Sequence, residues 1–229
     1  MEPEQPDLFG GLFGEKKEVE IEIENQEKIY TPFLPGVEIG EAYPHVKTLS
    51  ELEKEALSCQ KCRLRSTCNK VVFGEGPEKS RIMLIGEGPG KDEDEQGRPF
   101  VGRAGQLLDR ILNAAEIPRE KAYISNVVKC RPPGNRLPNP DEVHACRGYL
   151  EAQIRIIKPA IIVCLGSMAS QVIISPKARI TQIRGNWFMR GGIMIMPTFH
   201  PAALLRNESY KRPTWEDFKM IRDQFKKII

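Results

Sequence analysis

The chain has 229 residues, of which 40% are apolar, enough to bury one sizeable core in one or two domains. No apolar run approaches the ~18–20 residues of a membrane span, and the acidic start Met1-Glu2-Pro3-Glu4 is unlike a secretory signal, so we expect a cytoplasmic protein with no membrane partner. The net charge of +3 is uneven: residues 1–30 carry nine acidic and three basic residues, which leaves a basic remainder. That remainder is compatible with a polyanionic partner, and equally with scattered solvated lysines.

Residues 1–46 differ in composition from the rest of the chain. They combine an acidic stretch, Glu18 to Glu27, with segments rich in Pro and Gly such as Pro32 to Gly40. This composition predicts a mostly flexible N-terminal tail, in which Val19 to Ile23 could pair as a short strand. The predicted folded domain is 47–229.

From residue 47 onward, apolar β-branched runs alternate with helical patterns. Four runs predict buried strands: Ile82–Gly86, Ala122–Lys129, Ala160–Gly166 and Gly192–Phe199. Helices are predicted at Gly102–Glu116, Pro140–Lys158, Ser167–Ser175 and Thr214–Ile229. The alternation predicts an α/β fold, a three-layer α/β/α sandwich with a central, mainly parallel, four-stranded sheet. Ligands of such sheets bind at the carboxyl ends of the strands, where the polar and glycine-rich motifs of this chain lie.

The six cysteines indicate a metal or cluster site, because a chain without a secretion signal rarely uses disulfides. Cys59 and Cys62 form one close pair, and Cys130 and Cys146 could supply two further thiolates. Four sulfurs would suit a [4Fe–4S] cluster or a zinc ion, and buried free thiols are the alternative. Cys164 lies in an apolar run and is expected in the core, whereas Cys68 could be a substitute ligand.

The segment Gly86-Glu87-Gly88-Pro89-Gly90-Lys91 follows the first predicted strand. It lacks the first glycine and the Ser or Thr of a Walker loop, and it has Lys91 where a dinucleotide-binding loop needs glycine. A tight turn that approaches a flat ligand remains, or a purely structural turn. Phe100 lies in the next loop, where it could stack on a base or pack over the sheet.

These motifs, taken together, closely resemble the type 4 uracil-DNA glycosylases of thermophilic bacteria and archaea, among others. The resemblance covers roughly residues 50–229. It rests on the cysteine spacings and on four segments in order: Gly86–Gly90, Arg98–Gly105, Ser125–Arg136 and His200–Asn207.

The resemblance implies a monofunctional base-excision repair enzyme that flips uracil out of DNA, hydrolyses its N-glycosidic bond and leaves an abasic site. No lysine stands out as a Schiff-base nucleophile. The implied ligands of a [4Fe–4S] cluster, regarded as chiefly structural, are Cys59, Cys62, Cys130 and Cys146. The implied uracil-binding residues are Glu87, Gly88, Pro89, Phe100, Asn126 and His200.

The chemistry of uracil gives these residue types their roles. Phe100 could stack on the extruded ring, and the Asn126 amide could donate to O4 and accept from N3–H, a pair that cytosine reverses. His200 could stabilise the negative charge on the departing base. We expect Glu87 and His200 to be catalytic. Glu93 could exclude the thymine methyl group, unless Glu93 and Asp94 form a solvated acidic loop.

Several residues after the predicted strands are expected to contact DNA. Leu204 and Leu205 could wedge into the duplex, and phosphates could be bound by Arg206, Lys129, Arg131 and Arg136. Trp187 and Trp215 are expected to pack in the domain. The expected partner is uracil-containing DNA, single- or double-stranded, and we expect a monomer.

In the tail, Gln5-Pro6-Asp7-Leu8-Phe9 resembles the short peptide by which bacterial repair proteins dock on the sliding clamp. Gln5, Leu8 and Phe9 would then contact the clamp, and a featureless tail is the alternative. Three other functions stay open: a glycosylase with broader preference for deaminated purines, a non-catalytic DNA-binding module, and a zinc protein.

Overall fold

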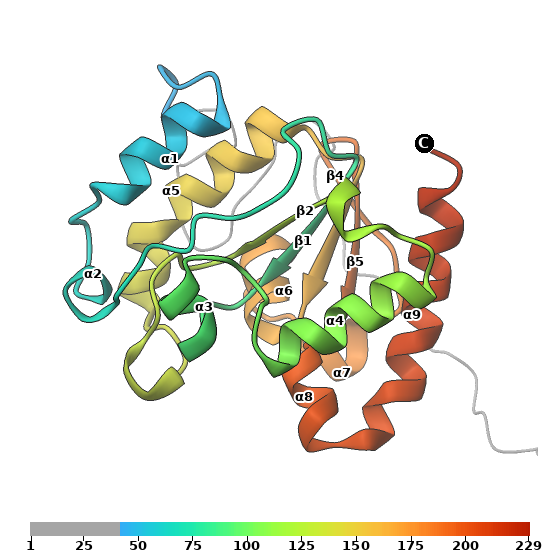
Figure 1. Ribbon diagram of the computed structural model, residues 1–229. Coiled ribbons are helices and arrows are strands. Elements are labelled where there is room, and N and C mark those ends of the chain that lie inside the picture. The colour runs from blue at the N-terminus through green and yellow to red at the C-terminus, as the bar shows by residue number, and fades with distance from the viewer. Residues whose placement is uncertain (1–41) are drawn as a thin grey trace, which may run out of the picture.

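A computed structural model describes residues 42–229, which form a five-stranded sheet between two layers of helices (Figure 1). The strand order is β2-β1-β3-β5-β4, and all neighbours are parallel except β4 and β5. The strands are β1 (Ile82–Gly86), β2 (Ala122–Asn126), β3 (Ile161–Leu165), β4 (Phe188–Arg190) and β5 (Ile193–Thr198).

The helices connect these strands and enclose the sheet. They are α1 (Leu49–Leu57), α2 (Leu64–Thr67), α3 (Lys91–Gln96), α4 (Arg103–Ala114), α5 (Pro140–Ile157), α6 (Ser167–Ile173), α7 (Ile180–Ile183), α8 (Pro201–Arg206) and α9 (Lys211–Phe225). Three 3-10 turns lie at Arg119–Lys121, Pro133–Asn135 and Glu208–Tyr210.

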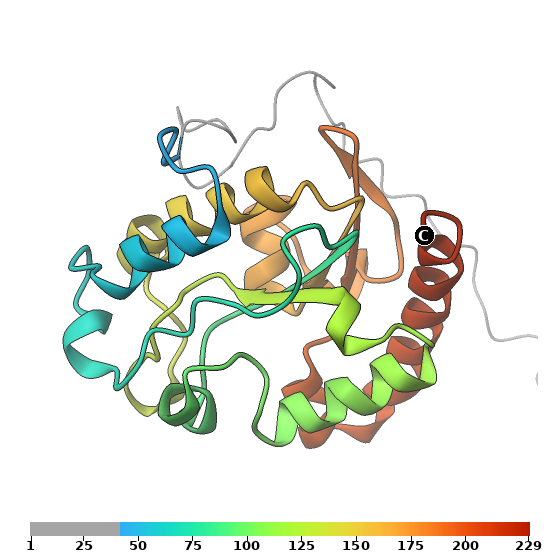
Figure 2. The ribbon, with the colours of Figure 1, turned by 45° about the horizontal axis from the view of Figure 1, so that its top comes forward.

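Alternate residues of the buried strands supply two separate cores. Met83 and Ile85 of β1 pack with side chains of α1, α5 and α6, whereas Ile82 and Leu84 pack with those of α4 and α9. Figure 2 shows α1 and α5 on one side of the sheet and α4 and α9 on the other. The alternation follows from the two-residue repeat of a strand, and it confirms the predicted three-layer α/β/α sandwich.

The sheet has one strand more than predicted. β1 matches its predicted bounds, and the other three predicted strands are each present but shorter. The four-strand prediction is wrong because it omits β4, an antiparallel edge strand of three residues. A segment this short, with partly exposed or exposed side chains, carries neither the alternation nor the apolar run that indicates a strand.

The folded domain also begins earlier than residue 47. The Tyr43 ring stacks on Tyr149 of α5 with centroids 4.8 Å apart, and Val46 is buried in the core. Arg155 donates to the carbonyl oxygens of Tyr43 and Val46 at 2.9 and 3.0 Å. The last residues of the predicted tail therefore belong to the domain. The clamp-binding peptide, with Gln5, Leu8 and Phe9, lies outside the described residues.

The longest helix of the described chain is α5, with 18 residues. In residues 42–229 no helix is both long and apolar enough to span a membrane. Trp187 and Trp215 lie against the core that contains α4 and α9, as expected.

Candidate active site

Three side chains converge on the carboxyl end of β1. Gly86 is paired in register with Asn126, the last residue of β2. A β-carbon added at Gly86 would lie 2.4 Å from Oδ1 of Asn126 and 2.6 Å from Cζ of Phe100. Phe100 in turn faces His200, with ring centroids 5.5 Å apart. The structure thus brings together Phe100, Asn126 and His200, from three distant segments, and glycine at 86 leaves them room.

The Asn126 amide is enclosed and has an unused acceptor. The residue is 1% exposed, and its Oδ1 atom has no hydrogen-bond partner among residues 42–229. A buried amide oxygen without a partner costs about 1–3 kcal/mol, so such an atom is retained where a ligand satisfies it. A ligand that presents an N–H group to the end of β2 would satisfy this oxygen.

Phe100 is fixed by its backbone as well as by its ring. Its φ angle is 53°, in the left-handed region that non-glycine residues rarely adopt, and its side chain is 6% exposed. A β-carbon at Gly105 of α4 would lie 1.9 Å from the Phe100 carbonyl oxygen, so α4 begins directly against this loop. Arg119 donates to the carbonyl oxygens of Pro99 and Phe100.

Glu93 of α3 holds the other side of the Phe100 loop. Its carboxylate accepts from the backbone N–H groups of Val101 and Gly102, both at 2.9 Å, and from Gly90 at 3.1 Å. Asp94 is buried and accepts from Asn69. The solvated-loop interpretation of these two acidic residues is therefore wrong. Both anchor loops.

His200 presents a defined tautomer to the site. It caps the N-terminus of α8, where its Nδ1 accepts from the backbone N–H of Ala202 at 3.1 Å. Burial, and to a lesser degree the positive charge of Arg206, lower the pKa of His200 to about 4. The imidazole is therefore neutral near pH 7, and Nε2 carries the proton as a donor.

Glu87, Gly88 and Pro89 continue from β1 along the segment that follows β2. The carbonyl oxygen of Glu87 accepts from the Val128 N–H at 3.1 Å. A β-carbon at Gly88 would lie 2.8 Å from Cγ2 of Val128, so this turn is close to its neighbour. Burial raises the pKa of the Glu87 carboxyl, against the opposing charge of Arg206.

The four predicted ligand cysteines line one cavity. Cys59, Cys62, Cys130 and Cys146 surround it together with apolar side chains such as Val71 and Val128. Cys164 is buried in the core, as expected, and Cys68 lies beside Cys130. In the part of the chain that the structure describes, no three His, Cys, Asp or Glu side chains converge closely enough to hold a single metal ion.

The cavity is an unfavourable place for thiolates without a cationic ligand. Burial raises the pKa of Cys130, and it raises that of Cys146 to about 11. The backbone N–H of Lys129 donates to Sγ of Cys146 at 3.2 Å, a contact that favours the thiolate. Four thiols around an apolar cavity fit a metal–sulfur group, which would replace the lost hydration of the charge.

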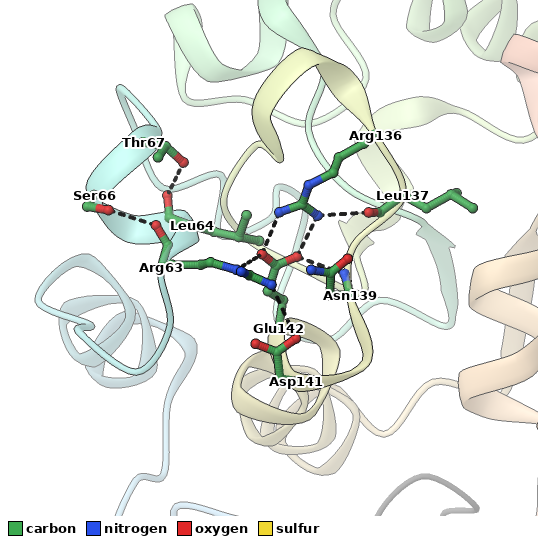
Figure 3. A network of polar contacts seen from close by, with 9 residues as sticks. All are labelled: Arg63, Leu64, Ser66, Thr67, Arg136, Leu137, Asn139, Asp141 and Glu142. Carbon is green, nitrogen blue, oxygen red and sulfur yellow. Dashed lines mark hydrogen bonds and ion pairs between the residues drawn. The ribbon is translucent and has the colours of Figure 1, made fainter.

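A buried carboxylate links the segments that carry the cysteines (Figure 3). Glu142, near the start of α5, has a fully buried side chain that accepts from Arg63 at 2.9 Å and from Asn139 N–H at 2.7 Å. Arg136 donates to both of its oxygens. The hydrogen bonds, led by that from Arg136, lower the pKa of Glu142 to about 2. Arg63 directly follows Cys62, so Glu142 joins the α2 segment, the loop after Cys130 and the helix of Cys146.

The predicted DNA-contacting residues are not equally accessible. Leu204 is 2% exposed and packed in the domain, so it cannot serve as a wedge in this conformation, whereas Leu205 is 40% exposed. Arg206 is exposed, and Arg131 is partly exposed and donates to Asn135. The phosphate-binding prediction is wrong for Lys129, which is 2% exposed, and Arg136 is already engaged by Glu142.

Sequence reasoning missed the buried or partly buried hydrogen bonds of Glu93, Lys129 and Glu142. The sequence carried one usable signal: Asn139 and Glu142 are spaced as a capping box ahead of a long helical pattern. Glu93 accepts from backbone N–H groups three to nine residues away, and Lys129 donates to Ser125, Asn126 and Gln153; neither set of contacts follows from a local sequence pattern.

The comparisons with known proteins agree with the geometry of the candidate active site. The family model described as "Uracil DNA glycosylase superfamily" matches residues 73–219. The type-4 uracil-DNA glycosylase of Thermotoga maritima is 45% identical over 191 residues, which cover 81% of this chain and 98% of that protein. Those of Sulfurisphaera tokodaii and Archaeoglobus fulgidus are 44% and 41% identical, with 77% of this chain covered and 84% and 92% of theirs. The chain belongs to the uracil-DNA glycosylase superfamily and, within it, to the type-4 uracil-DNA glycosylases.

Proposed function

We propose that this protein removes uracil from DNA by hydrolysing the N-glycosidic bond and leaves an abasic site for repair. The observation that carries the proposal is the Oδ1 atom of buried Asn126, without a partner in residues 42–229 and beside Phe100, whose ring faces His200, in a chain of this family. Asn126 and Phe100 are 1% and 6% exposed, so the target nucleotide must leave the stack to reach them.

Each polar group of the site has a partner on uracil. Asn126 Oδ1 accepts from N3–H, while its Nδ2 donates to O4. Cytosine presents an acceptor at N3 and a donor at C4, so it would leave both amide groups of Asn126 unpaired, and rejection by orders of magnitude follows. Phe100 stacks on the extruded ring, which recovers about 1–3 kcal/mol of the lost stacking.

Cleavage leaves negative charge on the departing base. The neutral His200 donates from Nε2 to O2 of uracil and stabilises that charge as it develops. Glu87 directly follows Gly86 and is the carboxylate nearest in sequence to the end of β1. We assign it the positioning of the attacking water. Glu87→Gln should lower the rate of base release while leaving DNA affinity unchanged. An unchanged rate would exclude this role.

The direct test is uracil release from defined single- and double-stranded oligonucleotides. The wild type should release uracil but not cytosine, and Asn126→Ala or His200→Ala should lower kcat/KM by about 100-fold or more. Full activity in both variants would contradict the assignment. Hypoxanthine and xanthine substrates test the broader preference, and DNA binding without any base release would indicate a non-catalytic module.

The accessible residues around the site suit a DNA strand. Leu205 is the exposed aliphatic side chain of α8, and Arg206 is exposed beside it. With Arg131 they would contact the strand from which uracil is extruded. Arg206→Ala should weaken binding and reduce its salt dependence, whereas Leu205→Ala should affect duplex substrates more than single strands.

We further propose that Cys59, Cys62, Cys130 and Cys146 hold a [4Fe–4S] cluster, which would tie the N-terminal helices to the central sheet. A single zinc ion needs its sulfurs about 2.3 Å away, so that they converge on one point. Four cysteines around a cavity without such convergence are better matched to four irons, each bound by one thiolate. Stoichiometric iron and sulfide would support the cluster, and stoichiometric zinc would exclude it. Cys68→Ser should retain the metal.

The N-terminal segment Gln5-Pro6-Asp7-Leu8-Phe9 supports a separate proposal, docking on a sliding clamp. Replacing Leu8 and Phe9 by Ala should abolish clamp binding without changing uracil release from short oligonucleotides. Equal binding by this variant and the wild type would contradict the proposal. Sedimentation of the free protein tests the expected monomer.

A further inference from the structure

Lys129 lies between the cysteine cavity and the end of β2, and every polar group of this residue is used. Its backbone N–H donates to Sγ of Cys146 at 3.2 Å, and its carbonyl oxygen accepts from Val72 N–H at 2.7 Å. The side chain is turned inward, with the residue 2% exposed. This position directly precedes Cys130 and is three residues after Asn126.

The ammonium group donates to three uncharged acceptors. These are the backbone oxygen of Asn126 at 2.8 Å, Oγ of Ser125 at 2.7 Å and Oε1 of Gln153 at 2.7 Å. None of the three is a carboxylate. A buried ammonium whose direct hydrogen-bond partners are all uncharged is costly, and an apolar side chain of the same length would avoid that cost.

The network around Lys129 extends across the sheet. Gln153 of α5 donates from Nε2 to the carbonyl oxygen of Phe73 at 2.9 Å and to the Tyr123 hydroxyl at 3.0 Å. Ser125 also donates to the Phe73 carbonyl oxygen. Ser125 and Asn126, the last two residues of β2, are therefore held by the buried hydrogen bonds of this network. The Asn126 side chain itself faces the candidate active site with Oδ1 unused.

We propose that Lys129 is a positioning residue for uracil recognition: its ammonium group fixes the backbone of Asn126, and so fixes the amide that reads the base. The inference rests on the proposed function. Lys129 does not touch the base. It acts by limiting the positions that the Asn126 amide can adopt, and a displacement of about 1 Å in such a group can cost about 100-fold in rate.

The test replaces Lys129 by Met, which keeps the length of the unbranched stem and removes the three donors. We expect kcat for uracil release to fall by about 10- to 100-fold, and inhibition by free uracil to weaken by about 10-fold. The KM for single-stranded DNA should change little, because phosphate contacts set it. Lys121→Met is the matched control, since Lys121 is exposed immediately before the same strand. Its constants should equal those of the wild type.

Two further variants keep the proposal testable if Lys129→Met does not fold. Ser125→Ala and Gln153→Leu each remove one acceptor of the ammonium group without touching Asn126 Oδ1. Each should give a smaller loss of the same kind, in kcat and in uracil inhibition. Adding Gln153→Leu to Lys129→Met should cause no further loss of kcat, because the two residues act through one network.

Iron content, measured for every variant, separates this role from support of the metal site. A folded Lys129→Met protein with wild-type kcat and uracil inhibition would overturn the proposal. So would a loss of iron that runs parallel to the loss of activity, because the lysine would then act through the cysteines. A wild-type protein that releases no uracil would instead overturn the proposed function itself.

Discussion

Arg136 and Glu142 form a two-pronged ion pair, in which the terminal nitrogens of the guanidinium donate to the two carboxylate oxygens at 2.8 and 2.7 Å. Arg63 approaches the same carboxylate from the α2 side. Two cations that belong to different segments thus share one buried anion. The relationship makes the position of the loop after Cys130 dependent on the start of α5.

Glu142→Gln should weaken this connection between the loop after Cys130 and the start of α5. Glutamine keeps the volume but cannot accept at both oxygens from two guanidinium groups, so the free energy of unfolding should fall by about 1–3 kcal/mol in urea. Asp141→Asn is the matched control: Asp141 is exposed and 3.7 Å from Arg63, so its loss should have little effect. Equal stability of the two variants would show that the buried carboxylate contributes no more than its exposed neighbour.

The pKa of His200 should lie well below the usual range of a histidine. With its pKa near 4, the folded protein keeps the ring neutral at pH values where an unfolded chain, with a pKa near 6.5, binds a proton. Stability should therefore be independent of this group above pH 6.5 and should decline as the pH falls from 6.5 to 4. NMR titration of the ring checks this, with the signal assigned by its absence in His200→Ala. A midpoint near 6.5 would contradict it.

Gly86→Ala should damage the site more than the fold. The added methyl group would lie 2.4 Å from Asn126 Oδ1 and 2.6 Å from the Phe100 ring, so both side chains must move. We expect a loss of about 100-fold in kcat/KM for uracil release. Gly192→Ala is the comparison, because no atom of residues 42–229 lies within 4 Å of its added β-carbon, although its φ of +78° is strained. That variant should lose stability alone. Unimpaired uracil release by Gly86→Ala would place the base elsewhere.

Glu93→Gln should free the loop that carries Phe100. The carboxylate accepts three backbone N–H groups, and a neutral amide would replace charge-assisted bonds with weaker ones. Uracil release should fall by about 10-fold, at a cost in stability of about 1–2 kcal/mol. Glu95→Gln, an exposed change in the same helix whose ion pair with Lys91 is 3.8 Å long, should have no such effect. Identical kinetics of the two variants would remove Glu93 from the support of the site.

The parts of the fold that could be predicted from sequence were those with long apolar patterns. The runs at β1 and β3 and the capped helix α5 are of this kind, and motifs at the ends of parallel strands necessarily share one edge of the sheet. α3 was missed because Lys91–Gln96 contains only charged and polar residues, so it has no apolar face to detect. Its helical turn is nevertheless what directs Glu93 to three N–H groups.

The candidate site was predicted as a set of residues and not as an arrangement. Motif order and family resemblance predicted that Phe100, Asn126 and His200 belong to one site, but they did not predict how deeply each side chain is buried. Lys129 and Leu204 illustrate the difference: a lysine in a basic motif and a leucine after His200 suggest surface contacts, yet both are 2% exposed. Whether a side chain turns inward depends on distant partners such as Gln153, which neighbouring residues do not reveal.

The left-handed backbone of Phe100 sets a limit on how this enzyme can be made more stable. At that φ angle glycine would relieve a strain of about 1–3 kcal/mol, but glycine has no ring to stack on a base. Every aromatic residue that restores stacking brings back the strained backbone. Engineering for heat resistance should therefore leave position 100 unchanged and seek its gains elsewhere, because loss of the buried ring would cost about 3–5 kcal/mol, more than the strain that glycine relieves.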